Sequence, residues 1–193
     1  MKRICVFCGS NSGANPAFAE AARQLGRLLA QRGIGLVYGG GCVGLMGEIA
    51  DSVMAESGEV IGVIPEALLA REVGHRGVTE LIVVRSMHER KARMAELADG
   101  FIAMPGGFGT FEELFEVITW AQLGIHRKPC GVLNVEGYYD SLIAFMDKAV
   151  EDGFVSAANR TLVLESRDPE TLLDLMDSSK PNYAEKWIDK DES

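Results

Sequence analysis

Residues 101–113 read Phe101-Ile102-Ala103-Met104-Pro105-Gly106-Gly107-Phe108-Gly109-Thr110-Phe111-Glu112-Glu113. An apolar run is followed by a glycine-rich turn and then by a helical pattern that starts at Thr110. Because glycine has no Cβ, this turn can bring backbone N–H groups close to a ligand, at the positive end of the helix dipole. Such a strand–turn–helix unit suits an anion, most often a phosphate. The two carboxylates that follow indicate an enzyme that acts on a phosphorylated substrate.

Six more short apolar runs flank this unit on both sides. They are rich in valine and isoleucine, and several are apolar at every position, which is typical of parallel strands covered on both faces. The runs are Ile4–Cys8, Ile34–Tyr38, Val60–Ile64, Leu81–Val84, Cys130–Leu133 and Leu162–Leu164.

Helical patterns lie between the runs. Asn15 caps the first helix and Pro16 opens it, the helix after the glycine turn stops at Gly124, and later helices are predicted at Tyr139–Val150 and Pro169–Met176. This alternation predicts one α/β domain with a three-layer, doubly wound, Rossmann-like parallel sheet. We expect the nucleotide-binding domain at residues 1–178 and a polar C-terminal tail at 179–193.

Composition limits the classes of partner. With 47% hydrophobic and 24% charged residues among 193, the chain is an ordinary globular sequence. Its net charge of −9, from 19 basic and 28 acidic residues, argues against broad nucleic-acid binding. No apolar stretch approaches the roughly 20 residues that span a bilayer, and residues 1–3 lead directly into a strand without a signal-peptide pattern. A cytoplasmic protein with no membrane partner is therefore expected.

Cysteine and histidine give no metal or redox signal. Cys5-x-x-Cys8 lies in an apolar strand and no second pair has zinc spacing, so we interpret both as buried thiols. His75, His88 and His126 are isolated. Neither a metal nor a cofactor is expected.

Three glycine loops follow strands, at residues 9–13, 39–44 and 105–110, and should meet at one edge of the sheet. Gly39-x-Gly41-x-x-Gly44 matches the dinucleotide fingerprint. However, it follows the second strand, and the nearest acidic ribose partner, Glu66, comes after Pro65. Nucleotide contact and tight helix–strand packing both remain open for this loop.

A further helix is predicted from Ser86, with Ser86-x-x-Glu89 as a capping box. Its inward stripe is Met87, Met94 and Ala98. Arg90 and Lys91 fall on the same stripe, where cations need carboxylates or a ligand anion as partners. The alternative is that their stems pack while their charged ends stay in water.

Glu113 also has two interpretations. Thr110-x-x-Glu113 is a second capping box. At about 100° per residue, however, Glu113 lies at the edge of the apolar helix face and close to the glycine loop, whereas Glu112 points away. We expect Glu113 to meet Arg90 and Lys91, and Glu72 in the loop after the third strand could supply another acid.

The motifs Pro-Gly-Gly-x-Gly-Thr-x-x-Glu at 105–113 and Met-His-x-Arg-Lys at 87–91 together resemble the LOG ("Lonely Guy") family. Its members are cytokinin riboside 5′-monophosphate phosphoribohydrolases, which older descriptions often called lysine decarboxylases. The resemblance covers roughly residues 2–165, including the segments at 5–10, 37–41 and 117–124.

The resemblance implies hydrolysis of the N-glycosidic bond of an adenosine-type 5′-monophosphate, giving the free base and ribose 5-phosphate. Arg90 and Glu113 would be the catalytic pair, and the protein would be a homodimer. The substrate-binding positions implied are Glu72, Met87, Lys91, Gly107, Phe108, Gly109, Thr110, Glu112 and Thr119, with Gly9, Ser10, Gly40 and Gly41 lining the same pocket.

Three alternatives use the same loops: a nucleotide-binding sensor without chemistry, an NAD-dependent oxidoreductase, and a pyridoxal phosphate decarboxylase. The last needs a lysine for a Schiff base, and Lys91 is the only lysine near the predicted pocket. The sequence does not decide between an N6-prenylated nucleotide and AMP.

Overall fold

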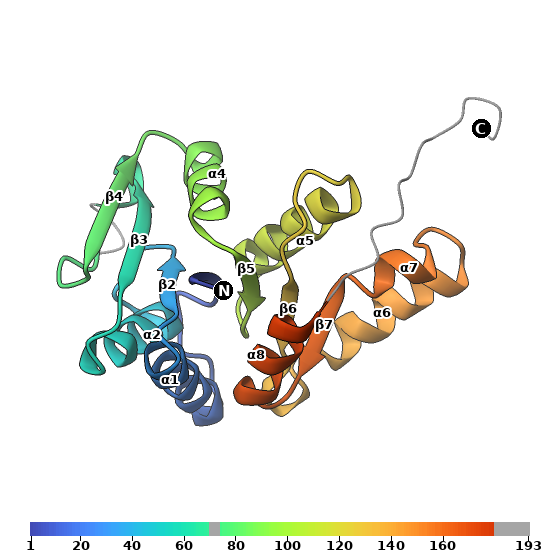
Figure 1. The fold of residues 1–193 in the computed structure, drawn as a ribbon, viewed down its shortest axis with the longest axis horizontal. Coiled ribbons are helices and arrows are strands. Elements are labelled where there is room, and N and C mark those ends of the chain that lie inside the picture. Colours follow the sequence, from blue (N-terminus) through green and yellow to red (C-terminus); the bar gives the residue numbers. More distant parts are fainter. Residues whose placement is uncertain (70–73, 180–193) are drawn as a thin grey trace.

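Seven parallel strands form the sheet in a computed structural model that describes residues 1–69 and 74–179 (Figure 1). Their order is β4-β3-β2-β1-β5-β6-β7. Glu72 and residues 180–193 of the predicted tail lie outside the described residues. The strands are β1 Arg3–Phe7, β2 Gly35–Tyr38, β3 Val60–Pro65, β4 Glu80–Val84, β5 Gly100–Ala103, β6 Cys130–Leu133 and β7 Val163–Ser166.

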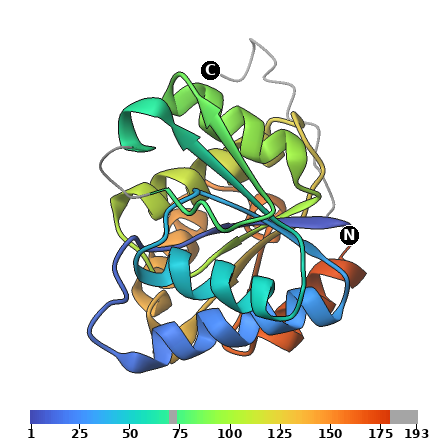
Figure 2. The same cartoon turned by 90° about the vertical axis from the view of Figure 1, so that its left-hand side faces the viewer.

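Helices cover both faces of the sheet, which confirms the doubly wound prediction. The helices are α1 Pro16–Gln31, α2 Gly44–Ala55, α3 Glu66–Leu69, α4 Met87–Leu97, α5 Phe108–Gln122, α6 Asp140–Glu151, α7 Ala157–Arg160 and α8 Pro169–Ser178, with a 3₁₀ turn, η1, at Val135–Gly137. α1, α2 and α8 share one core with one sheet face, and α4 and α5 pack on the other. Figure 2 shows α1 and α2 side by side, with α4 across the sheet from them.

The strand order reverses between β1 and β5. The chain first builds outward from β1 to β4 and then returns to place β5 on the other side of β1. The loops that follow these two strands leave in opposite directions, and this opens the crevice in which ligands of such sheets bind. Across it, the Gly9 N–H donates to the Pro105 carbonyl at 3.0 Å.

Most predicted boundaries are within two residues of the observed ones, and Asn15 caps α1 as expected. One difference affects the site: α5 begins at Phe108, not Thr110, with Gly107 as its N-cap. Thr110 is thus inside the first turn, and the capping-box interpretation of Thr110 and Glu113 is wrong. Ser86 does cap α4, but Glu89 accepts from the Arg85 N–H rather than returning a bond to Ser86.

The central strands are covered on both faces, while the edge strands β4 and β7 are partly exposed. Cys5 and Cys8 are buried free thiols, as predicted. Burial raises the pKa of both thiols. Within residues 1–69 and 74–179, no helix is long and apolar enough to cross a membrane.

Candidate active site

A cradle of backbone forms where the loops after β1 and β5 meet. A Cβ on Gly106 would lie 2.2 Å from Thr110 Oγ1 and 2.9 Å from the Gly9 nitrogen, so only glycine fits there. The Tyr138 hydroxyl donates to the Gly106 carbonyl, and the Tyr139 hydroxyl donates to Met104 at 2.6 Å. The cradle is therefore fixed from three loops.

A pocket of about 210 Å³ opens between these loops. It brings together two of the predicted glycine loops, those at residues 9–13 and 105–107. Phe18, Leu45 and Tyr138 complete its wall, and the rings of Phe18 and Tyr138 meet edge to face with centroids 5.6 Å apart. Nothing in the sequence pattern indicated these three side chains.

The N–H groups in the first turn of α5 face the cradle, and within the described part of the chain no capping side chain accepts a hydrogen bond from them. Gly107 has no side chain, and among the described residues no side chain caps this helix. The N–H groups of Phe108, Gly109 and Thr110 therefore have no intrahelical acceptor. Together with the helix dipole they form an anion site of the kind predicted from the sequence.

Arg90 and Glu113 form a buried ion pair beside this cradle. Arg90 Nη1 lies 3.2 Å from Glu113 Oε1, and the two side chains are only 11% and 10% exposed. Arg90 Nε also donates to the Val63 carbonyl at 3.1 Å, which fixes the guanidinium over the end of β3. The structure thus confirms that a carboxylate from α5 and a cation from α4 meet at this edge of the sheet.

The environment of Glu113 changes its acidity. Burial raises the pKa of Glu113 to about 6, because the charged form loses water; Arg90 opposes this change and the neighbouring Glu112 adds to it. Glu113 therefore changes its charge close to neutral pH, as a working carboxylate of an enzyme often does.

Gly39 makes room for the Arg90 guanidinium. A Cβ at this position would lie 2.1 Å from Arg90 Nη2 and 3.1 Å from Met46 Sδ. The missing side chain is thus required by a neighbouring side chain and not by backbone conformation. The sequence pattern places Gly39 in the glycine fingerprint and does not indicate this role, which depends on the packing of α4.

We expect Gly39→Ala to displace Arg90 and to lower turnover at least about tenfold, because the added methyl group takes the space of one guanidinium nitrogen. A double-variant cycle checks the cause. In an Arg90→Ala background the same change should cost nothing further, and independent, additive losses would contradict the assignment.

Lys91 is held by carboxylates of the protein. Its ammonium lies 2.5 Å from Glu112 Oε1 and 2.9 Å from Glu116 Oε1, and its side chain is 11% exposed. The sequence predicted that Lys91 would need carboxylates or a ligand, and the structure supplies two carboxylates, Glu112 and Glu116, in place of the expected Glu113. Glu116 was missed, although it is one helical turn from Glu112 and on the same face.

Three other predicted positions are exposed, and they differ in how they relate to the ion pair. Met87 is 42% exposed and so is not part of the inward stripe, but its sulfur lies 4.0 Å from Arg90 Nη1. Phe108, the first residue of α5, is 91% exposed. Thr119 is exposed two turns along α5 from Glu112, and its hydroxyl donates to the Phe115 carbonyl at 2.7 Å.

The loop at 39–44 serves packing at several of its glycines. Gly44, with φ +61°, lies so close to Ser10 that a Cβ would sit 2.3 Å from its carbonyl carbon. The carbonyl of Gly40 accepts from the His75 N–H at 2.9 Å, and Gly41 pairs with Gly74. Gly40 and Gly41 therefore contact the segment after residue 73, whereas Gly9 and Ser10 line the pocket. These contacts favour the tight-packing interpretation of the fingerprint.

The doubly wound sheet, the amide cradle at its switch point and the buried acid–arginine pair define a class: a Rossmann-like protein built to bind an anionic ligand beside a carboxylate. Residues 46–176 match the family model described as "Possible lysine decarboxylase". The chain belongs to this family, the LOG family of cytokinin riboside 5′-monophosphate phosphoribohydrolases, as its relatives show.

Similar proteins occur in Arabidopsis thaliana and in Oryza sativa subsp. japonica. Cytokinin riboside 5′-monophosphate phosphoribohydrolase LOG7 is 53% identical over 95% of this chain and 85% of its own length. LOG2 is 52% identical over 94% of this chain and 85% of its own length. In Oryza sativa subsp. japonica, the probable cytokinin riboside 5′-monophosphate phosphoribohydrolase LOGL9 is 53% identical over 93% of this chain and 79% of its own length.

Solved structures share the fold at low identity. The molybdenum cofactor binding protein of Rippkaea orientalis matches with a TM-score of 0.70 and 24% identity over 92% of this chain and 97% of that one. The molybdenum cofactor carrier protein of Chlamydomonas reinhardtii matches with a TM-score of 0.68 and 19% identity over 91% of this chain and 95% of that one. These likenesses support the architecture alone.

Proposed function

We propose that this protein hydrolyses the N-glycosidic bond of cytokinin riboside 5′-monophosphates, and of AMP, to the free base and ribose 5-phosphate. The observation that carries the proposal is the buried Arg90–Glu113 pair, one helical turn after the amide cradle of α5. A phosphate on the cradle would leave the ribose within reach of the Glu113 carboxylate.

The chemistry follows from these positions. The N–H groups of Gly107–Thr110 would hold the 5′-phosphate. Cleavage of the glycosidic bond develops positive charge at C1′ of the ribose, and the Glu113 carboxylate would stabilise this charge. Water then adds its oxygen to C1′, and its proton balances the base that departs. Arg90 cannot act as a proton donor at neutral pH, so its role is to position Glu113 and the substrate.

The state of Lys91 argues against the decarboxylase named in the family description. Burial alone would lower the pKa of Lys91, but hydrogen bonds to Glu112 and Glu116 outweigh burial and raise it. A Schiff base requires the neutral amine, which this environment disfavours. The hydrolase, in contrast, uses a charged Lys91.

One side-by-side assay tests the proposal. Purified protein is incubated with N6-isopentenyl-AMP, AMP and the unphosphorylated isopentenyl riboside, and free base is measured. We expect base from the monophosphates and at least about tenfold less from the riboside, because only the former engage the cradle. Binding of AMP without release of base would instead indicate the sensor, and reduction of added NAD would indicate the oxidoreductase.

The rate should also fall on acidification. Glu113 must be ionised to stabilise C1′, and its pKa is raised to about 6. The expected kcat/KM for a monophosphate therefore declines tenfold per pH unit well below pH 6 and levels off above it. A pH–rate profile flat down to pH 5 would contradict ionised Glu113 as the working form.

A homodimer in the cytoplasm completes the proposal. Exposed large apolar side chains on α5 and just after it, Phe108, Phe115, Leu123 and Ile125, support a protein interface. Light scattering should give about twice the 20.9 kDa of one chain, and a monomer at micromolar concentration would contradict the dimer. The cytoplasmic location stays a prediction.

A further inference from the structure

The Lys91 ammonium is bound by two carboxylates that differ in exposure. Glu112 and Glu116 lie one turn apart on α5, and both reach across to Lys91 on α4. The Glu112 side chain is 53% exposed and that of Glu116 is 25% exposed. Glu112 can therefore turn into water at low cost, whereas Glu116 loses more by releasing its partner.

The charge of this cluster opposes an anionic substrate. One lysine and two glutamates sum to −1, while the adjacent Arg90–Glu113 pair sums to zero. The ammonium has three N–H groups and these two carboxylates use two of them, so an anion that binds Lys91 through more than one N–H group must displace one carboxylate. Displacing the exposed Glu112 leaves Lys91 with one protein carboxylate and a place for the ligand.

We propose that Glu116 is a positioning residue for the reaction: it retains the Lys91 ammonium beside Arg90 and Glu113 while Glu112 exchanges its contact for the substrate. This inference rests on the proposed function and deepens it. It explains why α5 carries a third carboxylate, outside the glycine motif, on the face toward α4.

The pKa of Glu113 depends on the charges of the same cluster. The charged groups that face it are Arg90 and Lys91 from α4 and Glu112 and Glu116 from α5, and the thiols of Cys5 on β1 and of Cys8 just after it are close enough to interact with its charge. Because Glu116 raises the pKa of Glu113, its neutralisation should move the acidic limb of the pH–rate profile to lower pH.

The test compares KM in a double-variant cycle of Glu116→Ala and Lys91→Met. Losing a negative charge by itself favours an anionic substrate and lowers KM, whereas losing the hold on Lys91 raises it. We expect KM for N6-isopentenyl-AMP to rise about tenfold in Glu116→Ala, the scale of one charge-assisted hydrogen bond. In the Lys91→Met background only the loss of the negative charge remains, so the same change should no longer raise KM. An unchanged or lower KM, or fully additive effects, would overturn the proposal.

Two more variants separate positioning from folding. Glu116→Gln keeps the shape of the side chain, and its acidic limb should lie at lower pH than that of the wild type, a readout that loss of stability does not move. Glu96→Gln removes a carboxylate on α4 that is paired with Arg93 at 2.6 Å, and it should leave KM and the limb unchanged. If the wild type releases no base, the proposed function fails; an active wild type with an unaltered Glu116→Gln profile refutes only the role of Glu116.

Discussion

Glu113→Gln is expected to lower the turnover of N6-isopentenyl-AMP at least about 100-fold, the usual effect of removing one positioned electrostatic group. The amide keeps the shape of the side chain and a hydrogen-bond acceptor for Arg90, but it cannot neutralise positive charge at C1′. The loss should appear in kcat, while KM changes little, because the interaction strengthens only in the transition state. Initial rates of base release measure it.

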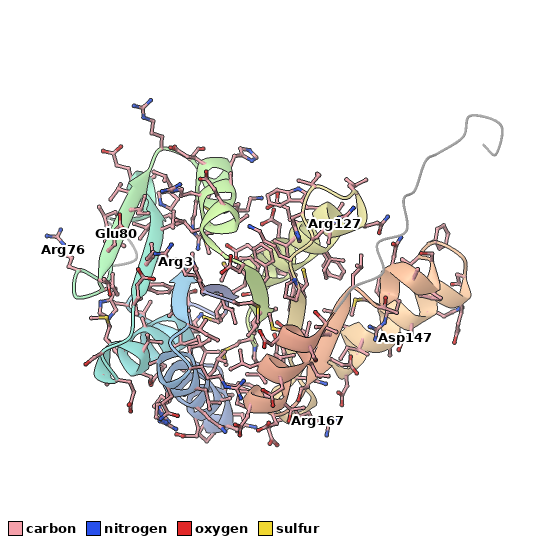
Figure 3. The ribbon with its side chains drawn as sticks, in the orientation of Figure 1. Arg3, Arg76, Glu80, Arg127, Asp147 and Arg167 are labelled. Carbon is pink, nitrogen blue, oxygen red and sulfur yellow. The ribbon has the colours of Figure 1, made fainter. Side chains whose placement is uncertain are left out.

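The matched control is Glu59→Gln. Glu59 is also an ion-paired carboxylate, 2.7 Å from Arg3, but Arg3 opens β1 at the end of the strand remote from the cradle (Figure 3 labels Arg3). This variant should retain wild-type turnover. Near-normal turnover by Glu113→Gln would remove Glu113 from the mechanism.

Arg90→Met is expected to reduce the free energy of unfolding by about 3–5 kcal/mol, because it leaves Glu113 buried without its partner. Turnover should fall at least about 100-fold as well. Combining Arg90→Met with Glu113→Leu should restore most of the stability, since an apolar pair of similar volume replaces both charges. Urea unfolding measures the loss of stability in both variants, and initial rates measure their loss of turnover, so the two effects can be distinguished.

The informative outcome is a double variant that is stable and inactive. It would show that the pair is retained for chemistry and not for folding. A single variant as stable as the wild type would contradict the burial of the pair, whose side chains are 11% and 10% exposed. A double variant that turns over substrate would contradict its catalytic role.

The sequence predicted the architecture because its signals are local. Each apolar run corresponds to one strand, and the strand–turn–helix at 101–113 corresponds to β5 and the start of α5. Parallel strands bring their following loops to one edge. The predicted family is confirmed by the relatives, and the meeting of Arg90 and Glu113 is confirmed by their 3.2 Å contact.

What the sequence did not provide depends on packing between distant elements. Residue 39 must lack a side chain because the Arg90 guanidinium, which bonds to Val63 of β3, occupies the place where a Cβ would lie. Thr110 and Glu113 match a capping box, yet the N-cap is Gly107, three residues before Thr110, and Glu113 is left to pair with Arg90. Tyr138 reaches the cradle from the loop after β6, which no short-range pattern encodes.

The most direct test of the central claim is the position of the nucleotide in a crystal structure of the Glu113→Gln variant bound to N6-isopentenyl-AMP. We predict the phosphate on the N–H groups of residues 107–110 and C1′ of the ribose against residue 113, with Arg90 behind it. A nucleotide whose phosphate lies away from this cradle, or whose C1′ lies out of reach of residue 113, would contradict the account.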